Sequence, residues 1–473
     1  MVFNSLHFVW FFIAVYTVYR LLPHRGQNWL LLIASYYFYA AWDWRFMGLL
    51  AASTIVDYTA ARLLDGAASP SRRRVYVSIS LGFNLALLGF FKYFNFFADS
   101  LQALFTGFGW PLDFVTLHVL LPVGISFYTF VTMSYVIDVY RREIGATRNF
   151  VDFAVFVAYF PHLVAGPILR ASRLMPQIAL PRQITREHIR DGLWLMTWGF
   201  FQKIFIADNL APLADSVFEP GTQPAGINVL LGTYAFAFQI YGDFAGYSNI
   251  ARGTSKLMGI ELIENFRFPY LVRTPQAFWR NWHISLSTWL RDYLYIPLGG
   301  SRGSGARTQR NLFVTMVLGG LWHGAAWTFV FWGMYQGILL VAYRAADRAA
   351  AFRAWTAGPR LLARATSWVV MFHLTCYGWL IFRARDAAQV GDLSARLFGA
   401  FDPAAVDLPQ LLVPLALYVT PLLLVHAMEA ERDDLLVVPK LPILVRYSIY
   451  AAIFYLTMLF GNFGGSEFIY FQF

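Results

Sequence analysis

The sequence LGGLWHGAAW, residues 318–327, places a histidine inside a stretch that otherwise has the composition of a membrane helix. His323 follows Gly319 and Gly320 and precedes Gly324, so small residues surround its ring where a neighbouring helix or a substrate can approach closely. An ionisable side chain within a membrane segment is costly and is by default a candidate functional residue. The alternative is a neutral imidazole that hydrogen-bonds a backbone carbonyl and only packs. Because histidine acts as a general base near neutral pH, we favour a catalytic role for His323.

The composition around this stretch is that of an integral membrane protein. Of the 473 residues, 58% are hydrophobic and 14% are charged, and the mean hydropathy is +0.50. Soluble proteins carry about 25% charged residues. Long apolar segments recur between Phe8 and Phe463, and they are continuous rather than alternating. Since a bilayer span needs roughly 20 apolar residues, we predict an all-α, polytopic protein with roughly ten to thirteen membrane helices. We expect these helices to form a single domain over residues 1–473.

The formal net charge of +10 is explained by membrane topology. Arginines gather in short connections between the apolar segments, at residues 71–74, 140–143, 182–190 and 302–310. Cytoplasmic loops carry such an excess, so we assign these connections to the cytoplasm. The connections contain no array of basic and aromatic residues suited to binding bases or phosphates. We therefore exclude a nucleic-acid partner. The single cysteine, Cys376, excludes an intramolecular disulfide and a cysteine metal cluster, and we expect no metal site.

Residues 265–300 form a second unusual region, NFRFPYLVRTPQAFWRNWHISLSTWLRDYLYIPLGG. It is too charged for an ordinary span and too aromatic for a free loop, which predicts helices that enter the membrane partway or lie in its interface. On one helix, His283, Ser287 and Arg291 would share a face able to line a polar cavity, with Arg280 one turn earlier. Arg280 and Arg291 could bind the donor there, and the alternative for the two arginines is that they meet lipid headgroups.

Two further features are weaker candidates. The glycine-rich sequence LGGSRGSGAR, residues 298–307, could hold the phosphates of a pantetheine-bearing donor through backbone amides and Arg302. The alternative is a flexible cytoplasmic turn. Asp138 and Asp243 lie near the ends of apolar segments, and we expect both to pair with arginines in a structural role.

These strings resemble the membrane-bound O-acyltransferase superfamily, and more closely its bacterial branch typified by alginate O-acetyltransferase. The resemblance rests on FWRNWHISLSTWLRDYLYIPLGG (278–300) and RNLFVTMVLGGLWHGAAWTFVFWG (310–333). LPVGISFYTFVTMSYVIDVYR (121–141) and YFPHLVAGPILR (159–170) are also similar to this branch. The similarity extends over nearly the whole chain, and long strings of Trp, His, Arg and Gly are more specific than a short motif.

The resemblance implies an acyltransferase activity, its catalytic residues and its location in the membrane. The histidine of the LWHG string, here His323, is the catalytic residue of that family, and the histidine of WHIS, here His283, is its second polar residue. The implied fold surrounds a tunnel through the bacterial inner membrane, with both histidines near its middle. An acetyl group would arrive from a cytoplasmic thioester, acetyl-CoA or a relative, with no bound cofactor. It would leave toward an exported polysaccharide, alginate or similar, with the help of a periplasmic acetyltransferase partner.

The residues leave alternatives open within this chemistry and beside it. We expect His323 to accept the proton of the attacking hydroxyl, while His283 either orients the acceptor or donates a hydrogen bond to the developing oxyanion. A covalent acyl group on His323 is a second possibility that the sequence does not separate from the first. A different class of function is a polytopic transporter or flippase whose histidines relay protons. A transporter would be expected to carry more intramembrane carboxylates than the few found here.

The last residues of the sequence, FIYFQF at 468–473, are unusually aromatic. Terminal residues are poorly ordered unless tied down, so we expect these rings to be buried. One reading is a simple anchor whose tyrosine hydroxyl stays hydrated. The other follows from similarity to teichoic acid and peptidoglycan acylation systems, in which a short aromatic motif bearing a tyrosine is proposed to carry the acyl group. On that reading Tyr470 accepts the acetyl group, and because a phenol has a pKa near 10 it needs His323 as base.

Overall fold

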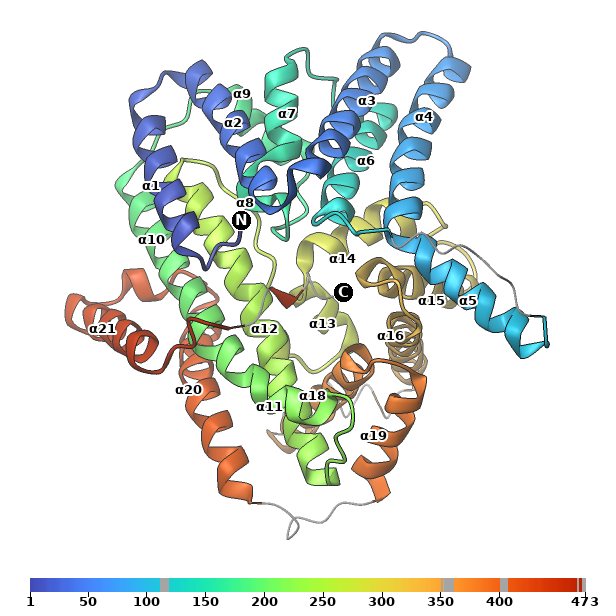
Figure 1. Ribbon diagram of the computed structural model, residues 1–473, viewed down its shortest axis with the longest axis vertical. Coiled ribbons are helices and arrows are strands. Elements are labelled where there is room, and N and C mark those ends of the chain that lie inside the picture. The colour runs from blue at the N-terminus through green and yellow to red at the C-terminus, as the bar shows by residue number, and fades with distance from the viewer. Residues whose placement is uncertain (111–118, 350–351, 353–360, 400–406, 466–467, 470–473) are drawn as a thin grey trace. The chain divides into compact units, whose positions relative to one another are not determined.

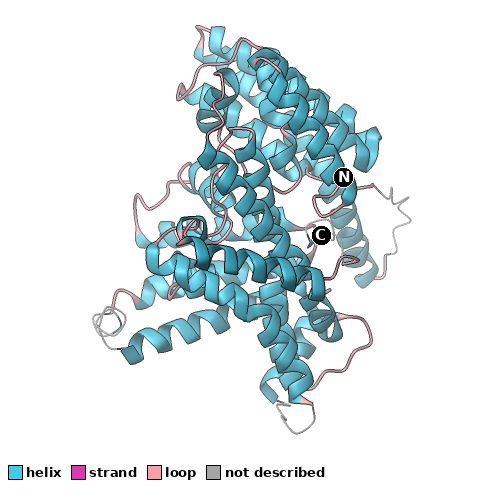
Figure 2. Ribbon diagram, turned by 90° about the vertical axis from the view of Figure 1, so that its left-hand side faces the viewer, coloured by secondary structure: helices cyan, strands magenta, loops and turns pink. Residues whose placement is uncertain are grey.

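The computed structural model describes residues 1–110, 119–349, 352, 361–399, 407–465 and 468–469. Helices joined by loops make up this described part of the chain, and no strand occurs in it (Figure 2). The all-α prediction is confirmed. The described residues divide into two compact units, one formed by residues 1–193 and 250–263 and the other by residues 194–249 and 264–473. The prediction of one domain over the whole chain stays a prediction.

The first unit is built mainly from the amino-terminal helices (Figure 1). They are α1 (Leu6–Leu21), α2 (His24–Asp43), η1 (Trp44–Phe46), α3 (Met47–Gly66), α4 (Pro70–Leu88), η2 (Gly89–Tyr93), α5 (Phe94–Gly107), α6 (Ile125–Arg141), α7 (Phe150–Ala158), α8 (Phe160–Leu163) and α9 (Ala171–Ala179). A buried carboxylate fixes α3 against α4, because Asp57 accepts hydrogen bonds from Ser80 (2.5 Å) and from Asn84 (2.9 Å). Such a fully hydrogen-bonded carboxylate is how a polar group is tolerated in an apolar interior.

The second unit holds the region of the two histidines. Two helices contribute residues to both units, α10 (Arg186–Phe200) and α12 (Gly226–Leu257). The others are η3 (Phe201–Ala207), α11 (Asp208–Phe218), η4 (Pro269–Leu271), α13 (Pro275–Asn281), α14 (Ile284–Leu290), η5 (Arg291–Tyr295), α15 (Gly305–His323), α16 (Trp327–Ala346), α18 (Leu361–Arg383), α19 (Ala387–Gly399), α20 (Leu408–Arg432), η7 (Val438–Lys440) and α21 (Ile443–Phe460).

The membrane character predicted from composition is confirmed, but the predicted count of spans is not. Within the described residues, four helical segments are long and apolar enough to cross a bilayer by themselves: residues 70–107, 361–383, 408–432 and 443–460. Their outward faces are apolar, as the exposed leucines of α21 show, with Leu444 81% and Leu459 72% exposed. The protein is therefore a multi-pass membrane protein. Roughly ten to thirteen spans around a tunnel remains a prediction.

The quoted sequence at 318–327 forms the bend between α15 and α16, which pack closely against each other (Figure 1). Three residues join the two helices, so they run antiparallel. Their backbones meet at Gly320 and Gly333, where an added Cβ on either residue would overlap backbone atoms of the opposite helix. A Cβ on Gly324 would overlap the Phe329 ring. The predicted close approach of a neighbouring helix is confirmed.

Candidate active site

His323 is the last residue of α15 and lies inside a cluster of aromatic rings. Its side chain is buried, with 4% of the residue exposed. The ring of Trp332 stands edge-on to it at 5.1 Å between centroids, Phe382 lies at 5.5 Å and Trp322 at 5.2 Å. These rings come from α15, α16 and α18, so three helices enclose one imidazole. An enclosure of this kind excludes bulk water, which strengthens any charge interaction made inside it.

His283 precedes α14 and adopts a left-handed backbone conformation, with φ 43° and ψ 56°. This conformation is uncommon for a residue other than glycine, and it persists only where the surroundings hold it. His283 is completely buried. Two hydrogen bonds to Asn265 hold it in this conformation. The backbone carbonyl of Asn265 accepts from the Ile284 N–H at 2.9 Å. Its side-chain Oδ1 lies 3.1 Å from Nδ1 of His283.

The contacts of Asn265 fix the orientation of its amide. The backbone N–H of Ser285 donates to Oδ1 at 3.2 Å, and the Ser285 hydroxyl donates to the same atom at 2.9 Å. Since a backbone N–H can only donate, the atom that it faces is the amide oxygen. His283 Nδ1 therefore carries a hydrogen and donates it to Asn265. In a neutral imidazole the remaining nitrogen, Nε2, is then a hydrogen-bond acceptor.

The two histidines meet although 40 residues separate them in the sequence. Their ring centroids are 6.3 Å apart. Trp322 lies 5.9 Å from the ring of His283, and Phe244 of α12 stands perpendicular to that ring at 4.7 Å. Ionisable groups from separate segments converge here in a buried aromatic setting, which is the arrangement expected of a catalytic site.

The predicted helical face of His283, Ser287 and Arg291 forms only in part. The His283 carbonyl accepts from the Ser287 N–H at 2.9 Å, but His283 precedes α14 in a left-handed conformation and the wider π-helical turn η5 begins at Arg291. The Arg291 side chain is 59% exposed and forms an ion pair with Asp292 at 2.7 Å. Arg280 and Arg302 are also exposed. These three arginines do not share the buried environment of the histidines, and their role in donor binding stays a prediction.

The glycine-rich sequence around Arg302 forms a tight turn. Gly299, Gly300 and Gly303 all have positive φ angles, of 110°, 54° and 109°. Such angles need glycine, which explains the composition of this turn without a ligand. Elsewhere, in the part of the chain that the structure describes, no group of three or more His, Cys, Asp or Glu side chains is arranged to hold a metal ion.

The aromatic residues near the carboxyl end of the sequence are described only in part. Phe468 is 4% exposed and packs on Tyr247 of α12, with 4.5 Å between ring centroids, so the predicted burial of this ring is confirmed. The backbone N–H of Ile469 donates to Oδ2 of Asp243 at 2.6 Å. Asp243 forms an ion pair with Lys203, so the prediction of an arginine partner is wrong. Tyr470 lies outside the described residues.

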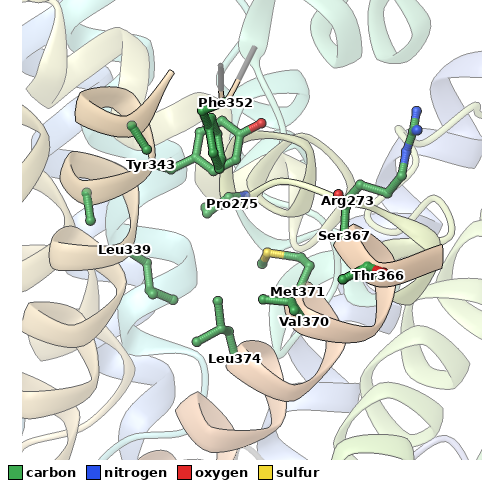
Figure 3. A pocket seen from close by; sticks show the side chains of 12 residues that line it. Arg273, Pro275, Leu339, Tyr343, Phe352, Thr366, Ser367, Val370, Met371 and Leu374 are labelled. Atoms are coloured by element: carbon green, nitrogen blue, oxygen red, sulfur yellow. The ribbon is translucent and has the colours of Figure 1, made fainter. Parts of the chain in front are cut away.

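One pocket of the second unit, of about 360 Å³, lies beside α16 and α18. Figure 3 shows Leu339 of α16 facing Val370 and Leu374 of α18, with Arg273 at the edge. Its lining is largely apolar, which suits hydrocarbon better than a sugar. Neither His283 nor His323 lines it. The candidate active site is thus defined by its side chains, not by this pocket.

Comparison with known proteins identifies the class to which this fold and this pair of histidines belong. The family model for membrane-bound O-acyltransferases matches residues 139–382, a range that contains both histidines. The chain belongs to the membrane-bound O-acyltransferase family, and it is an O-acyltransferase. This membership argues against the transporter or flippase alternative.

Particular relatives are similar over most of their length. The probable alginate O-acetylase AlgI of Azotobacter vinelandii is 46% identical over 86% of this chain and 80% of the relative. The probable alginate O-acetylase AlgI of Pseudomonas aeruginosa is 48% identical over 82% of this chain and 72% of the relative. The peptidoglycan O-acetyltransferase of Helicobacter pylori is 34% identical over 82% and 77% of the two chains.

Proposed function

We propose that this protein moves an acetyl group from a cytoplasmic thioester across the bacterial inner membrane for O-acetylation of an exported polysaccharide, alginate or a similar polymer. The proposal rests on the pair of buried histidines, His283 and His323. They come from separate segments of the chain and lie side by side among aromatic rings. The names of the relatives at 46% and 48% identity support the acetyl group and the alginate-like acceptor. We further propose a periplasmic acetyltransferase as the partner that completes delivery to the polymer.

His323 is the proposed general base. A thioester carbonyl is already electrophilic, so catalysis consists of removing the proton from the attacking hydroxyl and stabilising the tetrahedral oxyanion. The hydroxyl oxygen forms a bond to the carbonyl carbon while its proton passes to His323. When the intermediate collapses, the carbon–sulfur bond breaks and the leaving thiolate takes a proton back. A general base of this kind contributes typically 10²- to 10⁴-fold.

His283 is proposed to orient the hydroxyl that His323 deprotonates. Its Nδ1–H is committed to Asn265, so in the neutral ring Nε2 can accept a hydrogen bond but cannot donate one. In this tautomer Nε2 accepts the hydrogen bond of the hydroxyl and holds it in place before the reaction, and the single hydrogen of the hydroxyl then turns toward His323, which removes it. Because the ring centroids are 6.3 Å apart, a hydroxyl oxygen within reach of one imidazole lies near the other as well.

Tyr470 is the proposed first acceptor of the acetyl group. Phe468 and Ile469, the last described residues before it, are buried. Phe468 packs on Tyr247 and lies 6.0 Å from the ring of Phe244, which contacts the ring of His283. We propose that the phenol of the next residue in the sequence, Tyr470, reaches toward the histidines. His323 would take the phenol proton, the acetyl group would form an ester with Tyr470, and the partner would pass it to a polysaccharide hydroxyl.

The proposed activity is tested with purified protein in detergent and acetyl-CoA labelled in the acetyl group. We expect thioester loss, with label first on the protein and then, when a periplasmic partner and polymer are supplied, on the polysaccharide. A matched reaction with an acetylated carrier protein identifies the preferred thioester. No thioester loss with either donor, from protein that is monodisperse and folded, would overturn the proposal.

Tyr470→Phe tests the acyl-tyrosine step, because it keeps the ring and removes only the hydroxyl. We expect label on the protein to disappear and polymer acetylation to be lost. Tyr447→Phe is the matched control, since Tyr447 is a 56% exposed residue of α21. Normal polymer acetylation by Tyr470→Phe would show that this aromatic segment is an anchor only.

A further inference from the structure

A buried ion cluster in the second unit includes neither of the two histidines. Lys203 of η3 places its Nζ 2.8 Å from Oδ1 of Asp208 and 3.0 Å from Oδ1 of Asp243. The side chains are 7%, 2% and 4% exposed. Bringing three charges out of water is costly, and in a membrane protein such groups mark functional sites more often than ordinary packing. The proposed chemistry uses none of them.

The chain that follows α21 runs directly onto this cluster. Asn462 donates its backbone N–H to the Ile204 carbonyl at 3.0 Å and its side-chain amide to the Asp208 carbonyl at 3.2 Å. Seven residues later, the Ile469 N–H donates to Oδ2 of Asp243 at 2.6 Å. Hydrogen bonds to a carboxylate are stronger than those between neutral groups. The described residues of the segment 461–469 are therefore bonded near one end to the backbone of η3 and α11, which carry Lys203 and Asp208, and near the other end to the Asp243 carboxylate.

Glycines allow the segment to lie this close. A Cβ at Gly465 would overlap the carboxylate carbon of Asp208. A Cβ at Gly461 would overlap the Thr457 carbonyl and lie 2.8 Å from a methyl group of Ile204. Any larger residue at either position would push the segment away. The local sequence GNFGG is thus fitted to a place against η3 and α11.

The docked segment reaches the neighbourhood of His283 through one helix. Asp243 and Phe244 are consecutive residues of α12. Asp243 holds the Ile469 backbone, while Phe244 lies 6.0 Å from the Phe468 ring and 4.7 Å from the His283 ring. A shift of the segment along α12 would therefore change its distance from the candidate active site.

We propose that Lys203, Asp208 and Asp243 form a charged latch that holds residues 461–465 and 468–469 near His283, which makes Lys203 and Asp243 positioning residues of the transfer reaction. Lys203 keeps the Asp243 carboxylate in place, and that carboxylate holds the Ile469 N–H. The effect on transfer rests on the proposed function, whereas the docking itself does not. The alternative is an ion cluster that only stabilises the packing of η3, α11 and α12.

Hydrogen exchange measured by mass spectrometry on the full chain in detergent separates these alternatives. In the wild type we expect slow exchange in peptides that cover 461–469. In Asp243→Ala we expect exchange there to rise at least tenfold, with η3, α11 and α12 unchanged. Asp243→Asn keeps a carbonyl acceptor and should give a smaller rise. Asp57→Asn, which changes an equally buried carboxylate of the first unit, is the matched control and should leave these peptides protected.

The kinetic readout accompanies the exchange measurement. If the latch positions the acceptor, Asp243→Ala should lower kcat for acetyl transfer at least tenfold with an unchanged KM for acetyl-CoA. Unchanged exchange in 461–469, or exchange that rises throughout η3, α11 and α12, would overturn the latch. Failure of the proposed function gives a different pattern, in which Asp243→Ala releases the segment but wild-type protein transfers no acetyl group.

Discussion

His162 and His323 are both buried histidines, yet their surroundings differ in kind. His162, in α8 of the first unit, is 1% exposed, and its Nε2 lies 3.1 Å from the Phe156 carbonyl six residues earlier in the chain. His323 is 4% exposed and has a second imidazole, His283, at 6.3 Å. Burial is thus a poor guide to function by itself. What distinguishes His323 is a second ionisable ring, itself held by Asn265, that arrives from a different part of the sequence.

The largest effect expected from this comparison is at His323. We predict that His323→Ala lowers acetyl transfer by about 10²- to 10⁴-fold, because a general base contributes that much. The protein should still insert and fold, since His323 ends α15 next to glycine and alanine residues. Transfer is measured with labelled acetyl-CoA, and folding is measured by thermal unfolding in detergent.

His426→Ala is the matched control for this variant. His426 is a buried histidine of the same unit, 7% exposed, and its Nε2 lies 3.1 Å from the Tyr241 hydroxyl. We expect it to lose stability while each folded molecule keeps its transfer rate. Near wild-type transfer by His323→Ala, or an equal loss of transfer in both variants, would show that His323 has no catalytic role beyond that of a structural histidine.

A smaller, graded effect is predicted at His283. If this ring accepts a hydrogen bond from the hydroxyl and so orients it for His323, its removal costs up to about tenfold in rate, the upper end for a neutral hydrogen bond. His283→Gln keeps a hydrogen-bonding group and should lose less than His283→Ala. The measurement is kcat for acetyl transfer in both variants, with the unfolding temperature as a check. Equal activity of the two variants at the wild-type level would assign His283 to structure.

The sequence predicted the close helix packing around His323 but not the support of His283, and the reason is physical. The glycines that surround His323 are its neighbours in the chain, so their effect on helix packing can be read directly. His283 depends on a left-handed backbone angle and on Asn265, 18 residues away, and neither leaves a periodic signal. Helical spacing predicted a shared face with Arg291 because it assumed that one regular helix contains both residues.

The partners of the buried charged residues could not be predicted from the sequence either, because they lie even further apart in the chain. Lys203 and Asp243 are 40 residues apart, and only the packing of η3 beside α12 makes them partners. The prediction of an arginine partner rested only on the position of Asp243 near the end of an apolar segment, which does not identify its neighbours. The all-helical membrane fold, in contrast, follows from hydropathy that is present in every segment, so it could be predicted without any knowledge of contacts.

Replacing Asn265 is expected to lower the rate of acetyl transfer by less than replacing His283. Asn265→Ala removes the acceptor that fixes the tautomer of His283, and a neutral hydrogen bond of about 1 kcal/mol corresponds to roughly fivefold in rate. Asn28→Ala is the matched control, since Asn28 is a buried asparagine of the first unit that donates to Asp152 at 2.8 Å. Loss of transfer in both variants to the same degree would mean that Asn265 acts through stability alone.

The smallest effect on transfer is predicted at His162. His162→Gln can keep a donor toward the Phe156 carbonyl, but a flexible amide fills the ring's space less well, so we expect stability to fall by about 0.5–1.5 kcal/mol. Each folded molecule should transfer acetyl groups at the wild-type rate, because His162 Nε2 already faces a backbone carbonyl of its own unit. Thermal unfolding and kcat, measured on the same preparation, separate the two quantities. A large fall in kcat without a fall in stability would place His162 in the reaction, and would show that a satisfied hydrogen bond does not mark a histidine as structural in this fold.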